Sequence, residues 1–417
     1  MKRLLLAMIC YSITVTPCWA PEVSDHPRVM AAKADLAQAV AQRRRVIANW
    51  MPTVEATGEI GPAWTRDTIN GVPDPSIRDR APGPWSAEVR LTQPIIKDQL
   101  LIDELRVADA TIAQRSAALD DVCGSISRET RAIAIEAQST NDRLKVTGET
   151  QRQLKRVMAD VSKRVKAKDV PEVDLLDVRD RLSRWLLAEG DTQQRAALAE
   201  HRRLALWGGA VSAARKVISQ PVPPACASLE ECRAAVLAHA PQLRQARLAK
   251  DTAAIQLAQR SRPRLPEVAL QVGVKHSVQY ARTYEAEEAY GKVTARVPLP
   301  WGAEPQADLE SRRAAASAAT YRSSASEDEV AGQASIAWTT IQLGTGQVAL
   351  LGKRRAIAAQ VLTATEAAYK AGKRDARAYL DAVEALAQID LEQIRLTDER
   401  QIAHATLAYV TGVYACR

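Results

Sequence analysis

The residues best placed for covalent chemistry are Cys226 and Cys232, which stand close together in a proline-rich stretch. In an exported protein this spacing suits a small disulfide loop. A zinc site needs further ligands nearby, but no histidine accompanies the pair and the five histidines of the chain are scattered. The sequence therefore predicts a disulfide between Cys226 and Cys232, no metal site and no cofactor.

Catalytic and phosphate-binding motifs are absent from the sequence. It contains no GxSxG elbow, no HExxH pair and no glycine-rich phosphate loop, which are local signatures of hydrolases and nucleotide-binding enzymes. The long alanine-rich stretches also leave no obvious core in which a pocket would form. An exported hydrolase is the weakest alternative, and we do not expect an enzyme.

The N-terminus has the features of a secretory signal peptide over residues 1–20. A Lys-Arg pair precedes an apolar run from Leu4 to Val15, and Ala20 supplies a small residue for cleavage. Lipidation at Cys18 stays open as an alternative, although Pro17 replaces the small residue of a lipobox. The mature chain is therefore expected outside the cytoplasm.

The chain carries a formal net charge of +8, which by itself would suggest an acidic partner. Its basic residues are mostly spread along helical stretches, and Arg43-Arg44-Arg45 forms a tight cluster. Export also argues against nucleic acid. We therefore expect solvated helix faces and no nucleic-acid partner.

Four segments alternate apolar and polar residues, which is the pattern of strands with two different faces. We expect strands over about 53–65, 85–93, 267–280 and 289–299. In the second segment, for example, Val89 and Leu91 alternate with Glu88 and Arg90. Each segment has about nine residues or more, enough for a tilted strand to cross a bilayer. The apolar face would meet lipid and the charged face would line water.

Aromatic residues gather near the ends of these segments, as in the girdles of membrane barrels. They are Trp50 and Trp301 at one side, and Trp64, Trp85, Tyr280, Tyr284 and Tyr290 at the other. The alternative is a pair of amphipathic hairpins packed on a soluble core, because alternation alone does not distinguish lipid from a protein interior. Four strands leave open edges, which lipid does not tolerate. Membrane insertion therefore requires several chains to share one barrel.

The strands lie between helices in an arrangement that occurs twice. A short helix runs from Pro27 to Pro52 and another from Pro241 to Pro266. Two strands follow each, and then a helical stretch over about 97–167 or 305–370. Such a stretch of about 70 residues would extend roughly 105 Å.

Each long helix is followed by a short break and a returning helix, so each copy ends in a helical hairpin. Leu175-Leu176-Asp177 in the first returning helix matches Tyr379-Leu380-Asp381 in the second. We expect two repeats, over 21–205 and 236–415, joined by a proline-rich linker over 206–235.

This order of elements, repeated behind a signal peptide, resembles the TolC family of outer-membrane channel proteins over about residues 24–415. The prolines that open the short helices and the strands carry part of the resemblance. The rest lies in the strand exits Thr92-Gln93-Pro94-Ile95-Ile96 and Arg296-Val297-Pro298-Leu299-Pro300-Trp301-Gly302, and in the turn Tyr369-Lys370-Ala371-Gly372 with Leu380-Asp381 downstream.

The resemblance implies a mostly α-helical fold with a membrane β-part. Three chains would form a homotrimer in which four strands from each build one 12-stranded β-barrel in the outer membrane. The duplicated hairpins would form an α-helical barrel across the periplasm. The implied function is a passive exit duct for a tripartite efflux pump or a type I secretion system, with a periplasmic adaptor (membrane fusion protein) and an inner-membrane transporter as partners.

The resemblance also implies a periplasmic gate around the second helical turn. By position, its residues are Tyr369, Arg374 and Asp381, with Ala378 where the family has a further aspartate. A ring of Asp381 carboxylates would narrow and charge the pore. A plain alternative is a solvated carboxylate near a helix N-terminus, where negative charge is favoured.

The tips of the two hairpins are expected at Gly372 in the second copy and at Lys168 and Pro171 in the first. A periplasmic adaptor with one coiled-coil hairpin remains the alternative function for the chain as a whole. The charged faces of the strands mix both signs, so the cargo is open: drug, metal ion, protein or polysaccharide.

Overall fold

The computed structural model describes residues 26–60, 68–69, 72–73, 85–97, 101–207, 226–262, 266–279, 284–297 and 303–414. The predicted signal peptide, residues 208–225 of the predicted linker, and Trp64, Tyr280, Trp301 and Cys416 lie outside this part.

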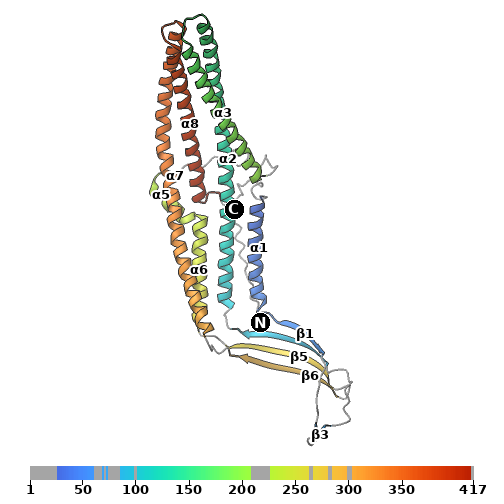
Figure 1. Cartoon of the computed structure of the whole chain (residues 1–417). Coiled ribbons are helices and arrows are strands. Elements are labelled where there is room, and N and C mark those ends of the chain that lie inside the picture. Colours follow the sequence, from blue (N-terminus) through green and yellow to red (C-terminus); the bar gives the residue numbers. More distant parts are fainter. Residues whose placement is uncertain are drawn as a thin grey trace, which may run out of the picture. The chain divides into compact units, whose positions relative to one another are not determined.

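The described elements are α1 (Pro27–Ala48), β1 (Thr53–Ile60), β2 (Thr68–Ile69), β3 (Val72–Pro73), β4 (Trp85–Ile96), α2 (Leu101–Lys166), α3 (Glu172–Trp207), α5 (Leu229–His239), α6 (Pro241–Ser261), β5 (Glu267–Gln279), β6 (Tyr284–Arg296), α7 (Glu304–Lys370) and α8 (Ala376–Val410). In both copies the described part contains a short helix, two long strands, a long helix and a returning helix in this order, whereas β2 and β3 belong to the first copy and α5 precedes the short helix of the second (Figure 1). The helices α2 and α7 have 66 and 67 residues.

Two compact units divide the chain, and they do not coincide with the two repeats. One takes the described residues within Met1–Ala34, Ser116–Gln245 and Ser324–Arg417, and the other takes Asp35–Arg115 and Ala246–Ser323. Each unit therefore contains parts of both repeats. The reason is that α2 and α7 are long enough to contribute to both units.

The unit that takes Asp35–Arg115 and Ala246–Ser323 is called the sheet unit. It contains one four-stranded antiparallel sheet in the order β1-β4-β5-β6. Its central pair, β4 and β5, joins the two repeats by backbone hydrogen bonds. The register places Val54, Leu91 and Val272 in one row across three strands. These side chains are 67%, 38% and 48% exposed, so the described residues leave the apolar face of the sheet uncovered.

Strand bounds differ from those expected. β6 begins at Tyr284 and not near 289, and β4 continues to Ile96 past 93. Backbone pairing causes both extensions, because Gln279 pairs with Tyr284 and Ile96 pairs with Val268. Hydrogen bonding along a ladder does not need an alternating sequence. The alternation of apolar and polar residues therefore does not predict where β6 begins and where β4 ends.

Tyr290 belongs to the polar face of the sheet, which corrects its expected place in an aromatic girdle. Its hydroxyl donates to Glu88 on β4, and Arg90 Nε also donates to Glu88 at 3.0 Å. To reach β4, the ring crosses Gly273 of β5, where an added Cβ would lie 2.8 Å from the ring. A glycine is needed here because the ring occupies the place of a side chain.

The other unit is called the helical unit. In it, the two hairpins α2–α3 and α7–α8 have turns of the same geometry. In the first turn, the amide of Asp169 donates to the carbonyl of Arg164 at 2.9 Å, and in the second, Lys373 donates to Ala368 at 2.9 Å. This is the Schellman pattern, which needs a left-handed residue after the helix. Gly372 provides it with φ +70°, and Lys168 adopts it with φ 64°.

Apolar side chains of mixed size, with several alanines among them, fill the packing between helices of this unit. One buried cluster joins α5–α8 through residues such as Val236, Leu243, Ala334 and Leu407. Alanine at such positions lets helix axes approach closely, which suits thin contacts between helices. Among the described helices, none is long and apolar enough to cross a membrane.

Replacing Lys168 by glycine should stabilise the first turn. The left-handed conformation costs a residue with a side chain about 1–2 kcal/mol, and the greater freedom of glycine in the open state cancels part of this gain. A net gain of about 0.7 kcal/mol corresponds to about threefold slower hydrogen exchange of the turn amides. Gly372→Ala is the matched control and should speed exchange at the second turn. Faster exchange in Lys168→Gly would contradict the assignment of strain.

Candidate functional site

The residues expected at a gate lie on both sides of the second hairpin turn. Tyr369 lies at the end of α7, Arg374 lies in the turn, and Asp381 lies in the second turn of α8. The start of α8 is fixed by Asp375, whose carboxylate accepts a hydrogen bond from the amide of Ala378 at 2.9 Å. An aspartate at this position satisfies an amide that the helix leaves unpaired. The backbone near Asp381 is therefore well defined.

Tyr369 connects the second hairpin to the first. Its hydroxyl donates to the carboxylate of Asp160 on α2. Its ring stacks on Tyr379 of α8, with centroids 5.5 Å apart and an interplanar angle of 10°. Burial, together with the hydrogen bond to Asp160, raises the pKa of Tyr369 to about 12. The phenol therefore stays a neutral donor throughout the physiological pH range.

Asp381 connects the same two hairpins through a buried arginine. Arg181 on α3, whose side chain is 8% exposed, donates from Nη1 to Asp381 at 2.7 Å and to Glu384 at 2.8 Å. Its Nε donates to Asp177 of its own helix at 3.2 Å. Trp185 Nε1 donates to the other oxygen of Glu384 at 3.1 Å. The guanidinium therefore holds carboxylates from both hairpins.

Burial on its own would lower the pKa of Arg181. The hydrogen bond to Asp381 and the charges of Glu384 and Asp177 more than offset burial, so the pKa lies above the usual arginine range. A buried guanidinium with several carboxylate partners is strongly held, whereas a buried charge that loses its partners is costly.

Arg374 has a different environment. Its side chain is exposed, and within the described part of the chain it makes no ion pair. The single chain thus brings Tyr369 and Asp381 to contacts with the first hairpin and leaves Arg374 in solvent. The tip residues Gly372, Lys168 and Pro171 shape the turns and touch none of the polar contacts described above.

Sequence reasoning missed Asp160 and Arg181, although both contact predicted residues. Arg181 follows Asp177 by one helical turn, a spacing that favours an ion pair on one helix. The corresponding position of the second repeat is Ala385. This difference between the two copies is the feature of the sequence that could have pointed to Arg181. For Asp160 the sequence carried no signal, because nothing local distinguishes it from other exposed acidic residues.

Apolar residues surround these polar contacts and hold the two hairpins together. The buried cluster includes Leu154 and Val157 of α2, Val178 of α3, and Leu380 and Val383 of α8. Arg181 and Glu384 lie beside this cluster and are shielded from solvent, with Glu384 18% exposed. The contact between hairpins therefore has an apolar centre with a charged network on one side.

Removing the guanidinium should loosen the contact between the hairpins. Arg181→Ala leaves Glu384 shielded without its cation, and breaking a buried pair costs about 3 kcal/mol. Hydrogen exchange of the facing turns of α3 and α8 should become faster by about a hundredfold. Arg184→Ala is the matched control, because Arg184 and its partner Asp180 are both exposed, at 62% and 64%. Equal effects of the two substitutions would contradict a structural role for Arg181.

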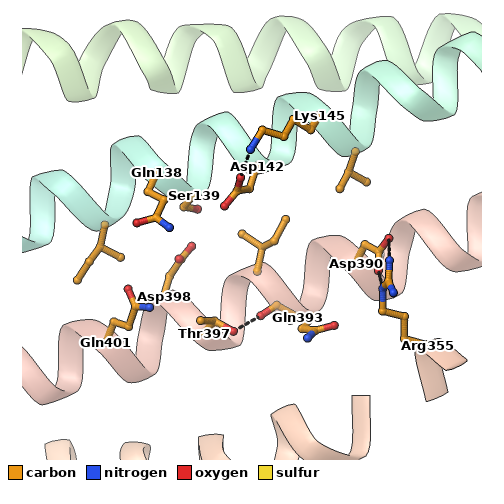
Figure 2. A pocket seen from close by; sticks show the side chains of 13 residues that line it. Gln138, Ser139, Asp142, Lys145, Arg355, Asp390, Gln393, Thr397, Asp398 and Gln401 are labelled. Carbon is orange, nitrogen blue, oxygen red and sulfur yellow. Dashed lines mark hydrogen bonds and ion pairs between the residues drawn. The ribbon is translucent and has the colours of Figure 1, made fainter. Parts of the chain in front are cut away.

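Between α2 and α8 lies a groove with a volume of about 370 Å³. Figure 2 shows side chains of α2 and α8 facing each other across it, with Arg355 reaching in from α7. Arg355 Nε donates to Asp390 at 2.5 Å, and Lys145 donates to Asp142 at 2.7 Å. Asp398 is half-buried in the groove. Burial raises its pKa above the usual aspartate range, and a hydrogen bond from Ser139 offsets this only in part.

The charge of Asp398 should weaken the fold at neutral pH. Its folded-state pKa is above the unfolded value of about 4, so its penalty is absent below pH 4, grows as pH rises from there to the folded pKa, and is complete above the folded pKa. Asp398→Asn should raise the midpoint of thermal unfolding by about 2 °C at pH 7 and have little effect at pH 4. Asp390→Asn, which loses the Arg355 pair, should lower the midpoint. A lower midpoint for Asp398→Asn at pH 7 would contradict the assignment.

The cysteine pair lies elsewhere in the helical unit, at the start of α5. Cys226 and Cys232 form a disulfide with Cα atoms 5.3 Å apart. Cys123 on α2 is also disulfide-bonded. Within the described residues, no group of three or more His, Cys, Asp or Glu side chains is arranged to hold a metal ion.

The sequence matches the family model described as outer membrane efflux protein over residues 23–209 and 233–413. No curated protein matches the chain. This membership decides against the adaptor alternative, since the model covers most of the chain and describes the outer-membrane component.

Several solved structures share the fold. The CmeC outer membrane channel of Campylobacter jejuni is 12% identical, with a TM-score of 0.77 over 94% of this chain and 84% of that one. The outer membrane protein VceC of Vibrio cholerae is 15% identical, with a TM-score of 0.70 over 94% of both chains. The open state of the Neisseria gonorrhoeae MtrE outer membrane channel is 14% identical, with a TM-score of 0.65 over 94% and 87%.

The sheet with its uncovered apolar face, the duplicated hairpins and the family match agree with one another. The chain belongs to the outer membrane efflux protein family: it is a non-enzymatic channel protein of the TolC type, located in the outer membrane with a helical extension into the periplasm.

Proposed function

We propose that three copies of the chain form one channel that serves as the passive exit duct of a tripartite efflux pump. The observation that carries this is the four-stranded sheet. Its apolar face is uncovered, and within the described chain β1 and β6 have a strand partner on one side only. Unpaired backbone groups are very costly in lipid. Three copies would pair every edge in one barrel of 12 strands.

Energy for transport comes from outside this protein in the proposal. The sequence contains no catalytic motif, and the helical extension offers a surface on which a periplasmic adaptor and an inner-membrane transporter can assemble. A type I secretion system is the second candidate, because it would use the same duct for an unfolded protein. The family description, which names efflux, favours the pump.

The contacts at the distal turns are proposed to hold the periplasmic mouth closed. Tyr369–Asp160 and Arg181–Asp381 both connect the two hairpins of one chain near their tips. Asp381 keeps 60% of its side chain exposed, so its carboxylate also remains available to a pore. Opening would require the tips to separate, and each of these contacts opposes that movement. The MtrE channel has been solved in an open state, which supports the existence of such a movement in a related fold.

Native mass of the protein extracted by detergent from outer membranes tests the assembly. A mass of three chains is expected. A monomer released without detergent would contradict the shared barrel.

The gate is tested by the conductance of single channels in planar bilayers. Tyr369→Phe removes the donor to Asp160, and Asp381→Ala removes the carboxylate that Arg181 holds and that narrows the pore. Each should raise the conductance, and the double substitution should raise it further. Asp180→Ala is the control, because Asp180 is an exposed acidic residue on α3 that pairs with Arg184, away from Asp381. Unchanged conductance in Asp381→Ala would remove Asp381 from the gate.

A further inference from the structure

The arginine cluster Arg43-Arg44-Arg45 lies near the end of α1, next to the sheet. α1 ends at Ala48 and β1 begins at Thr53, and both ends belong to the sheet unit. At 1.5 Å per residue, Arg44 and Arg45 lie about 6 Å and about 4.5 Å from the end of the helix. The cluster therefore stands directly before the first strand enters the membrane.

The three arginines do not have the same environment. Arg43 Nε donates to Asp109 of α2 at 2.6 Å, so this cation is used inside the chain. Arg44 and Arg45 are exposed, and within the described residues neither makes an ion pair. Two neighbouring guanidinium groups are therefore available to an anion from outside the chain.

Other arginines at this end of the helices have partners inside the chain. Arg260 of α6 pairs with Asp308 of α7, and Arg262, which follows α6, pairs with Asp103 of α2. These cations connect neighbouring helices. Arg44 and the residue after it do not contribute to the packing in this way, so packing does not explain them.

The second repeat carries no matching cluster. When the prolines that precede the strands are aligned, Ala258 and Gln259 take the positions of Arg44 and Arg45. The repeated architecture therefore does not require a basic pair before the strand. Each chain has one such pair.

Apolar side chains stand uncovered beside the cluster. Met51 lies between α1 and β1, and Ile95 and Ile96 end β4; these residues are 56%, 53% and 39% exposed. Ile96 pairs with Val268 of β5, which lies on the same face of the sheet as Val272. The apolar face of the sheet therefore continues to the end of β4.

Trp50 and Lys97 mark the boundary of this apolar surface. The ammonium of Lys97 stands 5.5 Å from the centroid of the Trp50 ring, and Trp50 Nε1 donates to Glu104 at 3.0 Å. Tryptophan with its polar edge turned to water is typical of the surface of a bilayer. Gln93 Nε2 donates to the carbonyl of Trp50 at 3.1 Å, which fixes the end of α1 against β4. The unpaired arginines therefore stand at a defined height, on the helical side of this boundary.

We propose that Arg44 and Arg45 bind the phosphate groups of anionic phospholipids in the periplasmic leaflet of the outer membrane. A guanidinium group presents paired donors that match phosphate oxygens. A lipid is the occupant because the two cations continue the apolar surface of the sheet, so acyl chains contact Met51 and Ile96 while the headgroup meets the guanidinium groups. The leaflet follows from the periplasmic direction of the helices. The inference depends on the sheet lying in the outer membrane, and it does not depend on the number of chains in the channel.

The charge of the two arginines sets the expected strength. One basic residue at an anionic membrane surface strengthens binding about fivefold, so the pair strengthens it about thirtyfold. A zwitterionic headgroup gains less, because its own cation opposes the arginines. Salt should weaken the preference for the anionic lipid by screening.

Native mass spectrometry of the full-length protein in detergent tests the proposal. The protein is titrated with phosphatidylglycerol and, separately, with phosphatidylcholine of the same acyl chains, and the wild type should bind phosphatidylglycerol more tightly. Arg44→Gln together with Arg45→Gln should raise the dissociation constant for phosphatidylglycerol about thirtyfold and change that for phosphatidylcholine little.

Lys353→Gln together with Arg354→Gln is the matched control. It also removes two adjacent, exposed positive charges, but these lie about 74 Å along α7 from the start of that helix. It should change neither dissociation constant. An equal loss in this control would assign the preference to net charge and overturn the proposal.

The other contrary outcomes are equally specific. Equal affinity of the wild type for both lipids, or an unchanged constant in the arginine variant, would overturn the site. Displacement of phosphatidylglycerol by millimolar inorganic phosphate would assign the arginines to a free anion instead of a lipid. The same spectra count the chains: loss of the oligomer in the arginine variant alone would assign the pair to a contact between chains and overturn the proposal, whereas a monomeric wild type that still binds phosphatidylglycerol would contradict the proposed channel and support the lipid site.

Discussion

Backbone hydrogen bonding in lipid is the constraint on which the rest of this structure depends. A strand in a bilayer must pair on both sides, and within the described residues the outer edges of β1 and β6 have no strand partner. In the proposed trimer, other chains complete the sheet. The helices of that trimer would repeat around a ring, so exposed apolar side chains on them, such as Leu187 and Leu343, are compatible with the same constraint.

Long helices with thin contacts need polar interactions to set their relative positions. The apolar contacts between the hairpins, which include Leu154, Val178 and Leu380, are not directional, so they do not by themselves fix the position of one helix along its neighbour. A buried arginine removes this freedom, because Arg181 keeps its partners only when Asp381 and Glu384 stand at one level. Tyr369 and Asp160 impose a similar condition near the tips. The polar network fixes the register, and apolar burial supplies the attraction.

Periodicity predicted much of the architecture, because strands and helices bury or expose residues at regular intervals. The order of elements, the strand faces and the hairpin turns could all be read in this way. The bounds of β4 and β6 could not, because backbone pairing continues where the alternation stops. Tyr290 was misassigned for a related reason: its ring crosses Gly273 to reach Glu88, and a contact between distant strands leaves no local pattern.

The predicted gate shows the same limit. The family resemblance pointed to Tyr369 and Asp381 as gate residues, but not to their partners on the other hairpin, which depend on how the hairpins pack. A comparison of the copies carried part of this information. Lys168 and Gly372 differ in type yet adopt the same left-handed conformation, because the turn hydrogen bonds are the same in both copies. Arg181 and Ala385 also differ in type, and of these two residues only Arg181 can form ion pairs with Asp381 and Glu384.

The duplication would by itself give a ring with six similar contacts between hairpins. Arg181 makes the contact within a chain different, since only the first repeat supplies a guanidinium and Ala385 cannot replace it in the second. Exposed charges contribute little and are screened by salt, whereas a buried network is costly to break. In the proposed channel, the Arg181 network would therefore oppose separation of the two hairpin tips more strongly than the exposed ion pairs do, and opening would have to break it.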